Sequence, residues 1–427
     1  MLSPYKRRHS RWYEVILFNP YFQAIVGLIF VSLLPALLIW TPQVVFIQRP
    51  EAAVNTISAI IFAYLGSFFI IRKLRKIPES NPLAYSIPSV LACWAVVAVV
   101  LVLSREETYS RPVLVGSLVV MLFWTALKSY LHKRYRKNKF ALVPFGRAQQ
   151  LNALDKAQMI TLNQPHLGNR RVNGVIADLH SEELPSEWQR FLAKCTLARI
   201  PVYHTQQVIE SLTGRVPINH LSENQFGSLL PSPIYSFFKR ILDLSLVIIS
   251  APVWLPVMLI TGLVIKLESD GPMFFKQERV GQADKTFTVY KLRSMCKDSE
   301  KNGAQFAQAN DARITRVGHF IRKTRLDEIP QFINVIKGDM SLIGPRPEQR
   351  VFVDQFEQEI PFYAYRHVVK PGITGWAQVV HGYAADAEDT QVKIEHDFYY
   401  IKNFSIWLDI LIVAKTIKTI LTGFGAR

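Results

Sequence analysis

Four long apolar segments near the N-terminus constrain the fold of this chain most strongly. They cover Ala24–Trp40, Val54–Ile71, Leu83–Leu103 and Val113–Leu131. A helix needs roughly 20 apolar residues to cross a bilayer, and each segment is close to that length. The first segment resembles a signal peptide in its basic prelude, but no small-residue cleavage site follows it. The sequence therefore predicts a membrane protein in which residues 1–138 form four transmembrane helices.

Lysine and arginine accumulate in alternate loops around these segments. The basic residues before the first segment are Lys6, Arg7, Arg8 and Arg11, and those of the second loop are Arg72, Lys73, Arg75 and Lys76. The other two loops are poor in basic residues, and "KSYLHKRYRKNK" follows the fourth segment. Because positively charged loops stay on the cytoplasmic side, we expect the N-terminus and everything after residue 132 in the cytoplasm.

Residues 139–230 are predicted to form a Rossmann-like α/β module. "FALVPFG", "VNGVIADL" and "IPVYH" are typical of buried strands, and "SEWQRFLAKCTL" is typical of a helix. A dinucleotide site would require G-x-G-x-x-G after the first strand, where only Gly146 is present. A structural or regulatory role is therefore favoured over nucleotide binding. Tyr235 and Lys239 have the Y-x-x-x-K spacing of some dehydrogenases, which we attribute to chance because the glycine loop is missing.

A fifth apolar stretch of 25 residues lies between Arg240 and Lys266. Its length would allow a fifth transmembrane helix. Prolines in its middle interrupt a helix, and a fifth span would send the basic C-terminal third outside, against the charge rule. We therefore predict a re-entrant helix over about residues 237–266 that breaks and returns to the cytoplasmic face. The residues expected at the break are Ser250, Pro252 and Pro256.

The net charge of +17 suits an anionic membrane surface or phosphorylated substrates. The apolar segments argue against nucleic acid as a partner. The last apolar stretch, "FSIWLDILIVAKTIKTILTGF", carries Asp409, Lys415 and Lys418. A charge at the bilayer centre costs roughly 2.5–3.5 kcal/mol or more, so this stretch is predicted to be an amphipathic helix in the membrane interface.

An adjacent pair of carboxylates, Asp327 and Glu328, lies in a strongly basic part of the chain. The surrounding cations include Lys291, Arg293, Arg313, Arg316 and Arg322. Such a surface is suited to a diphosphate, yet two carboxylates would repel it unless a divalent cation lay between them. Mg²⁺ prefers carboxylate and phosphate oxygens, and a carboxylate relieved of repulsion can attack phosphorus. The pair is therefore predicted to bind Mg²⁺ and to carry the chemistry.

Residues 236–424 closely resemble the polyprenyl-phosphate glycosyl-1-phosphate transferases, which form the bacterial sugar transferase family. The matching runs are "KRILDLSLVIISAPVWLP", "GPMFFKQERVG", "YKLRSM", "RITRVGHFIRKTRLDEIPQFINVIKGDMSLIGPRP", "KPGITGWAQV" and "YYIKNFSIWLDI". The preceding spans and the Rossmann-like module are similar to the long form of that family, which initiates exopolysaccharide or O-antigen repeats.

This resemblance implies that residues 231–427 form an α/β catalytic domain, seated on the cytoplasmic face of the bacterial inner membrane by the re-entrant helix. Members of the family transfer a sugar-1-phosphate from a UDP-sugar to undecaprenyl phosphate, with Mg²⁺, and release UMP. Glucose and galactose are the common sugars of the long form. The implied partners are the UDP-sugar, undecaprenyl phosphate and the lipid bilayer. The sequence leaves the oligomeric state open, with a homodimer through the membrane and Rossmann-like parts as one alternative.

The resemblance also assigns roles to residues. Asp327 is implied as the nucleophile, and Glu328 as its partner, either ligating Mg²⁺ or accepting a proton. Arg322 would orient a carboxylate or phosphate, and Arg346 would hold the nucleotide. The predicted substrate-binding residues are Arg322, Pro345, Arg346, Pro347, Lys291, Arg293, Arg313, Arg316 and Asp409. After "GITGWAQVV" members often carry Gly-Arg, whereas this chain has His381, Gly382 and Tyr383.

Two other functions remain open from the sequence. One is a catalytically silent membrane scaffold for polysaccharide assembly, against which the retained Asp-Glu pair and the Pro-Arg-Pro run both argue. The other is a membrane-tethered nucleotide-sugar dehydratase, which the missing glycine loop disfavours.

Overall fold

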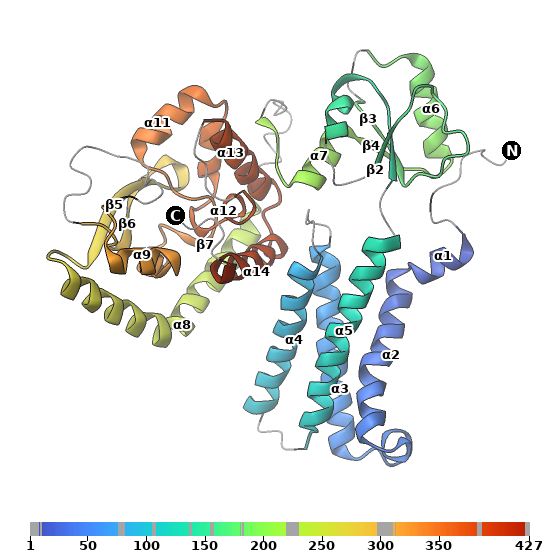
Figure 1. Cartoon of the computed structure of the whole chain (residues 1–427), viewed down its shortest axis with the longest axis horizontal. Coiled ribbons are helices and arrows are strands. Elements are labelled where there is room, and N and C mark those ends of the chain that lie inside the picture. The colour runs from blue at the N-terminus through green and yellow to red at the C-terminus, as the bar shows by residue number, and fades with distance from the viewer. Residues whose placement is uncertain are drawn as a thin grey trace. The chain divides into compact units, whose positions relative to one another are not determined.

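The computed structural model describes residues 8, 11–75, 82–104, 108–135, 139–153, 158–179, 181, 183–218, 230–296, 311, 313–381 and 387–422. The chain divides into two compact units, Met1–Gly214 and Arg215–Arg427 (Figure 1). Tyr383, where the sequence departs from the family pattern, lies outside the described residues.

The first unit begins with helices that are mostly apolar. They are the short α1 (Trp12–Leu17) followed by α2 (Pro20–Ile39), α3 (Glu51–Leu74), α4 (Leu83–Leu103) and α5 (Arg111–Tyr135). Figure 1 shows α2 to α5 lying side by side as a bundle. Each of these four is long and apolar enough to cross a membrane. The N-terminal apolar helices of a membrane protein, predicted from the four segments, are therefore confirmed.

Close packing in this bundle depends on a small residue in α2. A Cβ atom at Gly27 would lie 2.4 Å from the hydroxyl oxygen of Tyr64 and 2.4 Å from the indole nitrogen of Trp124. The Tyr64 hydroxyl donates a hydrogen bond of 2.8 Å to the carbonyl of Ala24. Small residues allow helix backbones to approach closely where lipid gives no hydrophobic driving force between helices. Gly27 thus admits the side chains that join α2 to α3 and α5.

A four-stranded parallel sheet completes the first unit. The strands are β1 (Lys139–Leu142), β2 (Gln158–Thr161), β3 (Gly174–Ala177) and β4 (Val202–His204), in the order β2-β1-β3-β4. The helical segments are η2 (Gly146–Ala153), α6 (Ser186–Leu197) and α7 (Thr205–Thr213). The predicted α/β region is therefore confirmed, and α6 coincides with the predicted helix. The sequence did not predict β2, which is short and has exposed ends.

The carboxyl ends of β1 and β3 are where a dinucleotide fold would bind phosphate. Here the backbone N–H of Arg147 donates to the carboxylate of Asp178 at 3.1 Å. His204 lies 3.5 Å from the other oxygen of that carboxylate. An anionic side chain therefore faces the turn that would otherwise face a phosphate. The structural or regulatory role favoured from the sequence stays a prediction.

The second unit is an α/β domain that begins with one long helix. Its elements are α8 (Pro233–Glu268), β5 (Phe274–Val280), η5 (Gln282–Asp284), β6 (Thr286–Leu292), α9 (Arg316–Lys323), η6 (Leu326–Glu328), α10 (Gln331–Lys337), β7 (Ser341–Ile343), α11 (Arg350–Glu359), η7 (Tyr363–Val368), β8 (Gly372–Thr374), α12 (Trp376–Val380), α13 (Ala387–Lys402) and α14 (Ile406–Thr422). Strands β5 and β6 form an antiparallel hairpin, and β7 pairs with β8 in parallel.

Helix α8 continues through both of its prolines, so the predicted break in the helix is wrong. Pro252 and Pro256 lie inside the helix, and Figure 1 shows α8 changing direction part-way along its length. Proline removes a backbone donor and weakens the preceding turn. The Ser250 hydroxyl donates to the carbonyl of Leu246 at 2.6 Å, and the indole N–H of Trp254 donates to that of Val247 at 2.9 Å. The hydroxyl of Ser250 bonds back to the preceding turn, a contact that often bends a helix, and α8 bends here instead of breaking.

One face of α8 is buried from its first turns to its last. The buried residues recur at helical spacing and are Lys239, Asp243, Val247, Trp254, Met258, Gly262 and Ile265. The apolar side chains among them, from Val247 to Ile265, pack in a core with Val289 of β6, Ile321 of α9 and Val335 of α10. The opposite face exposes large apolar side chains such as Ile249 and Leu267. The helix therefore lies along the α/β domain and presents an apolar surface away from it.

Asp409 joins α8 to the C-terminal helices. Its carboxylate accepts hydrogen bonds from the hydroxyls of Tyr235 (2.6 Å) and Tyr400 (2.9 Å) and from the ammonium of Lys239. Tyr235 and Lys239 are the Y-x-x-x-K pair of the sequence. Their spacing places both on one face of α8, where they serve packing of the helices.

Candidate active site

Asp327 and Glu328 lie on a single turn of 3-10 helix, η6, directly after α9. Arg325 adopts a left-handed conformation, with φ of 60°, which ends α9 and starts the turn. Leu326 packs against the apolar core below. The packing of Leu326 fixes the turn that carries the two following carboxylates. Both are buried, since Asp327 is 9% exposed and Glu328 is 7% exposed.

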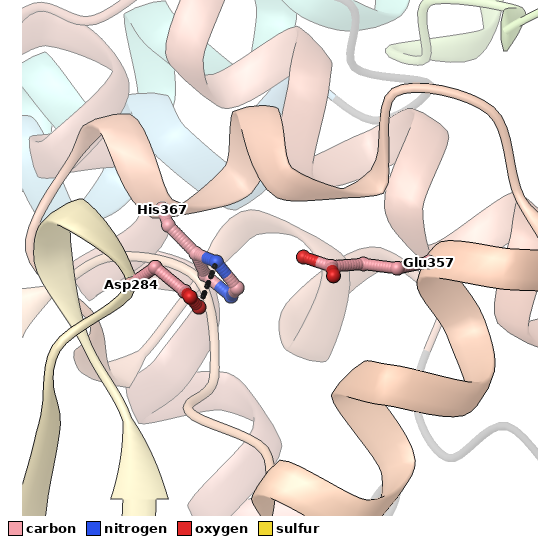
Figure 2. Close-up of side chains that lie close together, drawn as sticks. All are labelled: Asp284, Glu357 and His367. Carbon is pink, nitrogen blue, oxygen red and sulfur yellow. Dashed lines mark ion pairs between the residues drawn. The ribbon is translucent and has the colours of Figure 1, made fainter.

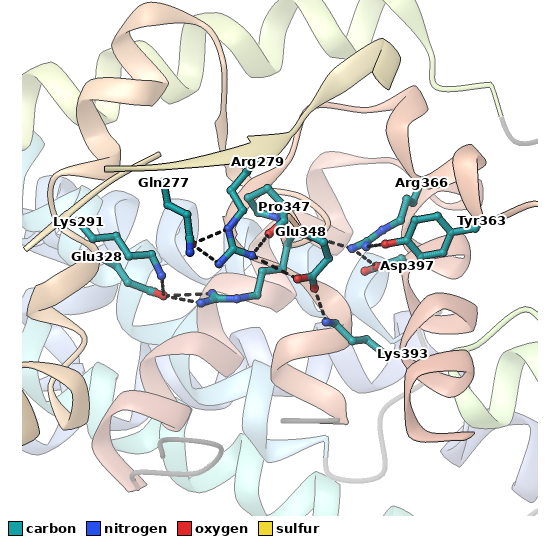
Figure 3. Close-up of polar contacts among 11 residues, drawn as sticks. Gln277, Arg279, Lys291, Glu328, Pro347, Glu348, Tyr363, Arg366, Lys393 and Asp397 are labelled. Atoms are coloured by element: carbon teal, nitrogen blue, oxygen red, sulfur yellow. Dashed lines mark hydrogen bonds and ion pairs between the residues drawn. The ribbon is translucent and has the colours of Figure 1, made fainter. Parts of the chain in front are cut away.

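Three cations hold Glu328. Arg346 donates two hydrogen bonds, of 3.1 and 3.0 Å, to its Oε1 atom. Lys291 of β6 lies 3.8 Å from the same oxygen (Figure 3), and Arg325 lies 3.9 Å from Oε2. Burial by itself would raise the pKa of Glu328, but the charges of Arg346 and Lys291 hold that pKa well below its usual range. Glu328 is therefore ionised.

Asp327 has a different environment. Its Oδ1 atom is buried and has no hydrogen-bond partner among the described residues. Burial, and then the neighbouring negative charge of Glu328, raise the pKa of Asp327, while Lys291 and Arg322 oppose the rise. A buried polar atom without a partner is costly and calls for a ligand or a chemical role. One carboxylate of the pair is thus tied to cations, and the other has an oxygen ready for a ligand or a substrate.

The pair fits the Mg²⁺ expected from the sequence. Mg²⁺ is commonly bound by one or two carboxylates together with substrate phosphates. The unpartnered Oδ1 atom of Asp327 offers one such oxygen, and Glu328 beside it offers a second carboxylate. Asp327 and Glu328 are therefore the residues that would hold the ion.

The Pro-Arg-Pro run follows strand β7 directly. The backbone N–H of Gly344 donates to the carbonyl of Thr374 at 2.9 Å, which continues the pairing of β7 with β8. A Cβ atom at Gly344 would lie 2.4 Å from the carbonyl of Lys370, so only glycine fits this approach. The close pairing of β7 with β8 fixes the position of Pro345. From there the side chain of Arg346 reaches Glu328.

The structure brings some of the other predicted residues to the pair and gives the rest different contacts. Arg322 donates to the Ser294 hydroxyl at 2.8 Å and acts electrostatically on Asp327. Arg293 instead donates to the carbonyl of Ser269 (2.7 Å) at the end of α8. Arg313 pairs with Asp311 at 2.6 Å. Arg316 is exposed at the first position of α9. The bonds of Asp409 described above are structural, and the substrate-binding roles of these residues stay predictions.

Several functional candidates were absent from the predicted set. Arg325 contacts Glu328, and its position two residues before Asp327 was a signal in the sequence. Glu348 follows the Pro-Arg-Pro run directly. Its burial and its ion pair with Arg279, at 3.3 Å, could be seen only in the folded structure. Arg366, which contacts the Arg346 carbonyl, had no local sequence signal.

A second group of possible metal ligands is formed by Asp284, Glu357 and His367 (Figure 2). Their ligand atoms lie within 4.8 Å of one another. Asp284 and Glu357 are exposed, and Asp284 is paired with Arg350 at 3.1 Å. The Mg²⁺ site expected from the sequence at Asp327 and Glu328 stays a prediction, which the Oδ1 atom of Asp327, without a hydrogen-bond partner among the described residues, continues to favour.

Known proteins match this chain in sequence. A protein of Aeromonas hydrophila, named UDP-N-acetylgalactosamine-undecaprenyl-phosphate N-acetylgalactosaminephosphotransferase, is 54% identical over 424 residues, which cover 99% of this chain and 100% of the relative. The sequence profile described as bacterial sugar transferase matches residues 234–423. The chain belongs to the bacterial sugar transferase family. The family recognised from the sequence is confirmed, and with it the enzyme class, an undecaprenyl-phosphate glycosyl-1-phosphate transferase.

Other relatives are less similar and match about half of this transferase. The UDP-glucose:undecaprenyl-phosphate glucose-1-phosphate transferase of Escherichia coli (strain K12) is 38% identical over 231 residues, 52% of this chain and 48% of the relative. A protein of the same name from Caulobacter vibrioides is 40% identical over 203 residues, 47% of this chain and 76% of the relative.

Proposed function

We propose that this transferase moves a sugar-1-phosphate from a UDP-sugar to undecaprenyl phosphate through a covalent intermediate on Asp327. The observation that supports the proposal most directly is the unequal pair at the site. Glu328 is held by three cations, whereas Asp327 keeps a buried oxygen that has no hydrogen-bond partner in the described part of the chain. An unengaged carboxylate among cations is suited to attack an anionic phosphorus centre.

The reaction has two displacements at one phosphorus atom. In the first, a carboxylate oxygen of Asp327 bonds to the sugar-bearing phosphorus of the UDP-sugar. The bond from that phosphorus to the bridging oxygen breaks, and UMP leaves with the electron pair. In the second, an oxygen of undecaprenyl phosphate bonds to the same phosphorus and the acyl-phosphate bond breaks. This restores the Asp327 carboxylate and gives undecaprenyl-diphosphate-sugar, the starting lipid of exopolysaccharide or O-antigen assembly.

The cations of the site stabilise the negative charges that take part in these steps. Lys291, Arg322 and Arg346 lower the pKa of Asp327 against the effect of its burial and so favour the ionised form that attacks. Their charges are also placed to stabilise a diphosphate. Mg²⁺ bound by Asp327 and Glu328 would supply further charge neutralisation for the phosphate groups.

N-acetylgalactosamine-1-phosphate is our proposal for the transferred group. The relative that matches the whole chain, from Aeromonas hydrophila, carries that sugar in its name, whereas the glucose-named relatives match about half of the chain. Glucose and galactose, the sugars expected from the family resemblance, are the competing outcomes.

The contacts of α8 support a re-entrant position in the membrane. Near its start, Arg240 donates to the carbonyl of Ile336 at 3.0 Å. At its end, Glu268 accepts from the backbone N–H of Val317 at 3.0 Å. Both ends of the helix therefore contact one α/β domain. A helix that crossed the bilayer would leave the domain at one end, so we propose that α8 enters and leaves at the cytoplasmic face while α2 to α5 span the membrane.

A screen of UDP-sugars with undecaprenyl phosphate tests this function. The purified enzyme should release UMP with Mg²⁺ and both substrates, and fastest with UDP-N-acetylgalactosamine. A faster rate with UDP-glucose or UDP-galactose would overturn the sugar assignment alone. No release with any UDP-sugar would overturn the function. Homodimer formation stays a prediction from the sequence.

A further inference from the structure

Every backbone carbonyl from Pro345 to Glu348 is held by a hydrogen bond. The donors, in chain order, are the N–H of Gly372 (2.9 Å), the guanidinium of Arg366 (2.7 Å), the guanidinium of Arg279 (3.1 Å) and the N–H of Val280 (2.9 Å). The prolines on either side of Arg346 have fixed φ and no N–H of their own. The segment that carries Arg346 is therefore fixed through its carbonyl groups, by donors from several distant parts of the chain.

Arg366 is the donor that holds Arg346 itself. Its guanidinium also donates to Asp397 at 3.0 Å and to the hydroxyl of Tyr363 at 2.6 Å (Figure 3). Arg366 is 4% exposed and Asp397 is 1% exposed. An arginine buried this deeply keeps one orientation, because its carboxylate partner and the tyrosine fix the plane of the guanidinium.

Helix α13 contributes one acidic and one basic side chain to the contacts of this segment. Lys393 and Asp397 lie one turn apart and therefore on one face of the helix. Lys393 donates to Glu348 at 2.7 Å, and Glu348 accepts in turn from Arg279 at 3.3 Å (Figure 3). Arg346 and Glu348 are thus both connected to α13 through buried charges.

Buried ion pairs of this kind are expensive to form. The desolvation of two charges offsets most of their attraction, and apolar replacements of similar volume are often equally stable. Stability alone is therefore a weak reason for placing Arg366 and Asp397 here. Their geometry has a second consequence, since fixing the Arg346 backbone places its guanidinium 3.0 Å from Glu328.

We propose that Arg366 and Asp397 are positioning residues of the transferase, which set the place of Arg346 relative to Glu328. Neither residue is required to touch a substrate. The proposal rests on the proposed function, because Arg346 is taken to act on the nucleotide and on the carboxylate pair. Losing Asp397 would let the Arg366 guanidinium rotate, and the carbonyl of Arg346 would lose its fixed donor.

The first test compares two substitutions on α13. Asp397→Asn should lower kcat/KM for the UDP-sugar by about tenfold or more, the effect expected for a lost charge-assisted hydrogen bond. Glu395→Gln is the matched control, because Glu395 is also buried and binds the N–H of Ile218 (3.2 Å) and Arg215 (3.6 Å) instead of the Pro-Arg-Pro run. Equal activity of the Asp397→Asn variant and the wild type would overturn the proposal.

The second test asks whether Asp397 acts through Arg346. In an Arg346→Ala background, Asp397→Asn should cause no further loss of kcat/KM, because the side chain to be positioned is gone. A loss as large as in the wild-type background would overturn the positioning role. UMP release by the wild-type enzyme reports on the proposed function, and the ratio of variant to wild-type rates reports on this inference.

A third measurement separates positioning from folding. The double variant Arg366→Met/Asp397→Leu removes both charges together, so we expect a melting temperature in detergent close to that of the wild type. Its kcat/KM should nevertheless fall at least as far as that of Asp397→Asn. A stable double variant with wild-type activity would overturn the inference. This test remains decisive even if the Asp397→Asn variant fails to fold.

Discussion

The guanidinium of Arg346 donates both of its hydrogen bonds to a single oxygen of Glu328, at 3.1 and 3.0 Å. The second oxygen of Glu328 is left to Arg325, at 3.9 Å. Glu328 is in this way surrounded by positive charge, and Asp327 beside it is not hydrogen-bonded through Oδ1 in the part of the chain that is described. Two adjacent carboxylates thus have different chemistry because their partners differ.

Asp327→Asn should abolish turnover, since the amide keeps the shape of the side chain but cannot attack phosphorus. UMP release with UDP-sugar and undecaprenyl phosphate measures the loss, and an unchanged melting temperature shows that the fold is intact. Activity above about one hundredth of the wild-type value would contradict the role of a nucleophile.

Arg346→Ala should raise KM for the UDP-sugar strongly, by about tenfold or more, because a charge-assisted bond to the nucleotide is lost. Arg350→Ala is the matched control, as Arg350 pairs with Asp284 and Asp354 at the start of α11. The control should leave KM unchanged. An unchanged KM in Arg346→Ala would show that the nucleotide is held elsewhere.

A covalent intermediate predicts ping-pong kinetics. Enzyme incubated with UDP-sugar labelled in the sugar, and without lipid, should retain sugar phosphate and release about one UMP per active site. The Asp327→Asn variant should retain no label. Sequential kinetics with no trapped adduct would favour direct attack by the lipid phosphate, with Asp327 acting only on the metal.

The re-entrant position of α8 predicts that Cys296 faces the cytoplasm. Cys296 is exposed, whereas Cys195 is buried. In a Cys195→Ser background, a membrane-impermeant maleimide should label Cys296 in inside-out vesicles and not in intact spheroplasts. An Arg427→Cys variant, made in the same background, is the control. Labelling of both cysteines only from outside would mean that α8 crosses the membrane.

Glu348 should make stability fall in acid. Burial would raise the pKa of Glu348, but Lys393, Arg366 and Arg279 lower it from 4.5 to about 2. A carboxyl whose folded pKa is depressed stabilises the fold above its unfolded pKa, and this contribution is lost as the pH falls from 4.5 toward 2.

Melting temperatures of the wild type and of Glu348→Gln in detergent, at pH 7 and pH 4, test this. The wild type should lose more stability than the variant between these values. Asp397 faces the same network, and burial raises its pKa, so its contribution has the opposite sign. The charge of Glu348 adds to this rise, so the contribution of Asp397 is smaller in the variant and reduces the expected difference. Equal losses would contradict the assignment.

The sequence by itself determined the parts of this protein that depend on local pattern. Apolar length alone gave the N-terminal helices, and short runs typical of strands and of a helix gave β1, β3, β4 and α6. The adjacent acids and the ordered family motifs identified Asp327, Glu328 and Arg346 before any contact was known, because neighbouring residues or a continuous run carry each of them.

Only the tertiary structure decided which charges meet. Arg293, Arg313 and Lys291 look alike in the sequence, yet only Lys291 reaches Glu328, since strand pairing and helix ends direct each side chain differently. The support of Arg346 by Arg366 and Asp397 joins positions up to about 50 residues apart in the chain. Long-range contacts of this kind leave no local pattern for a sequence to reveal.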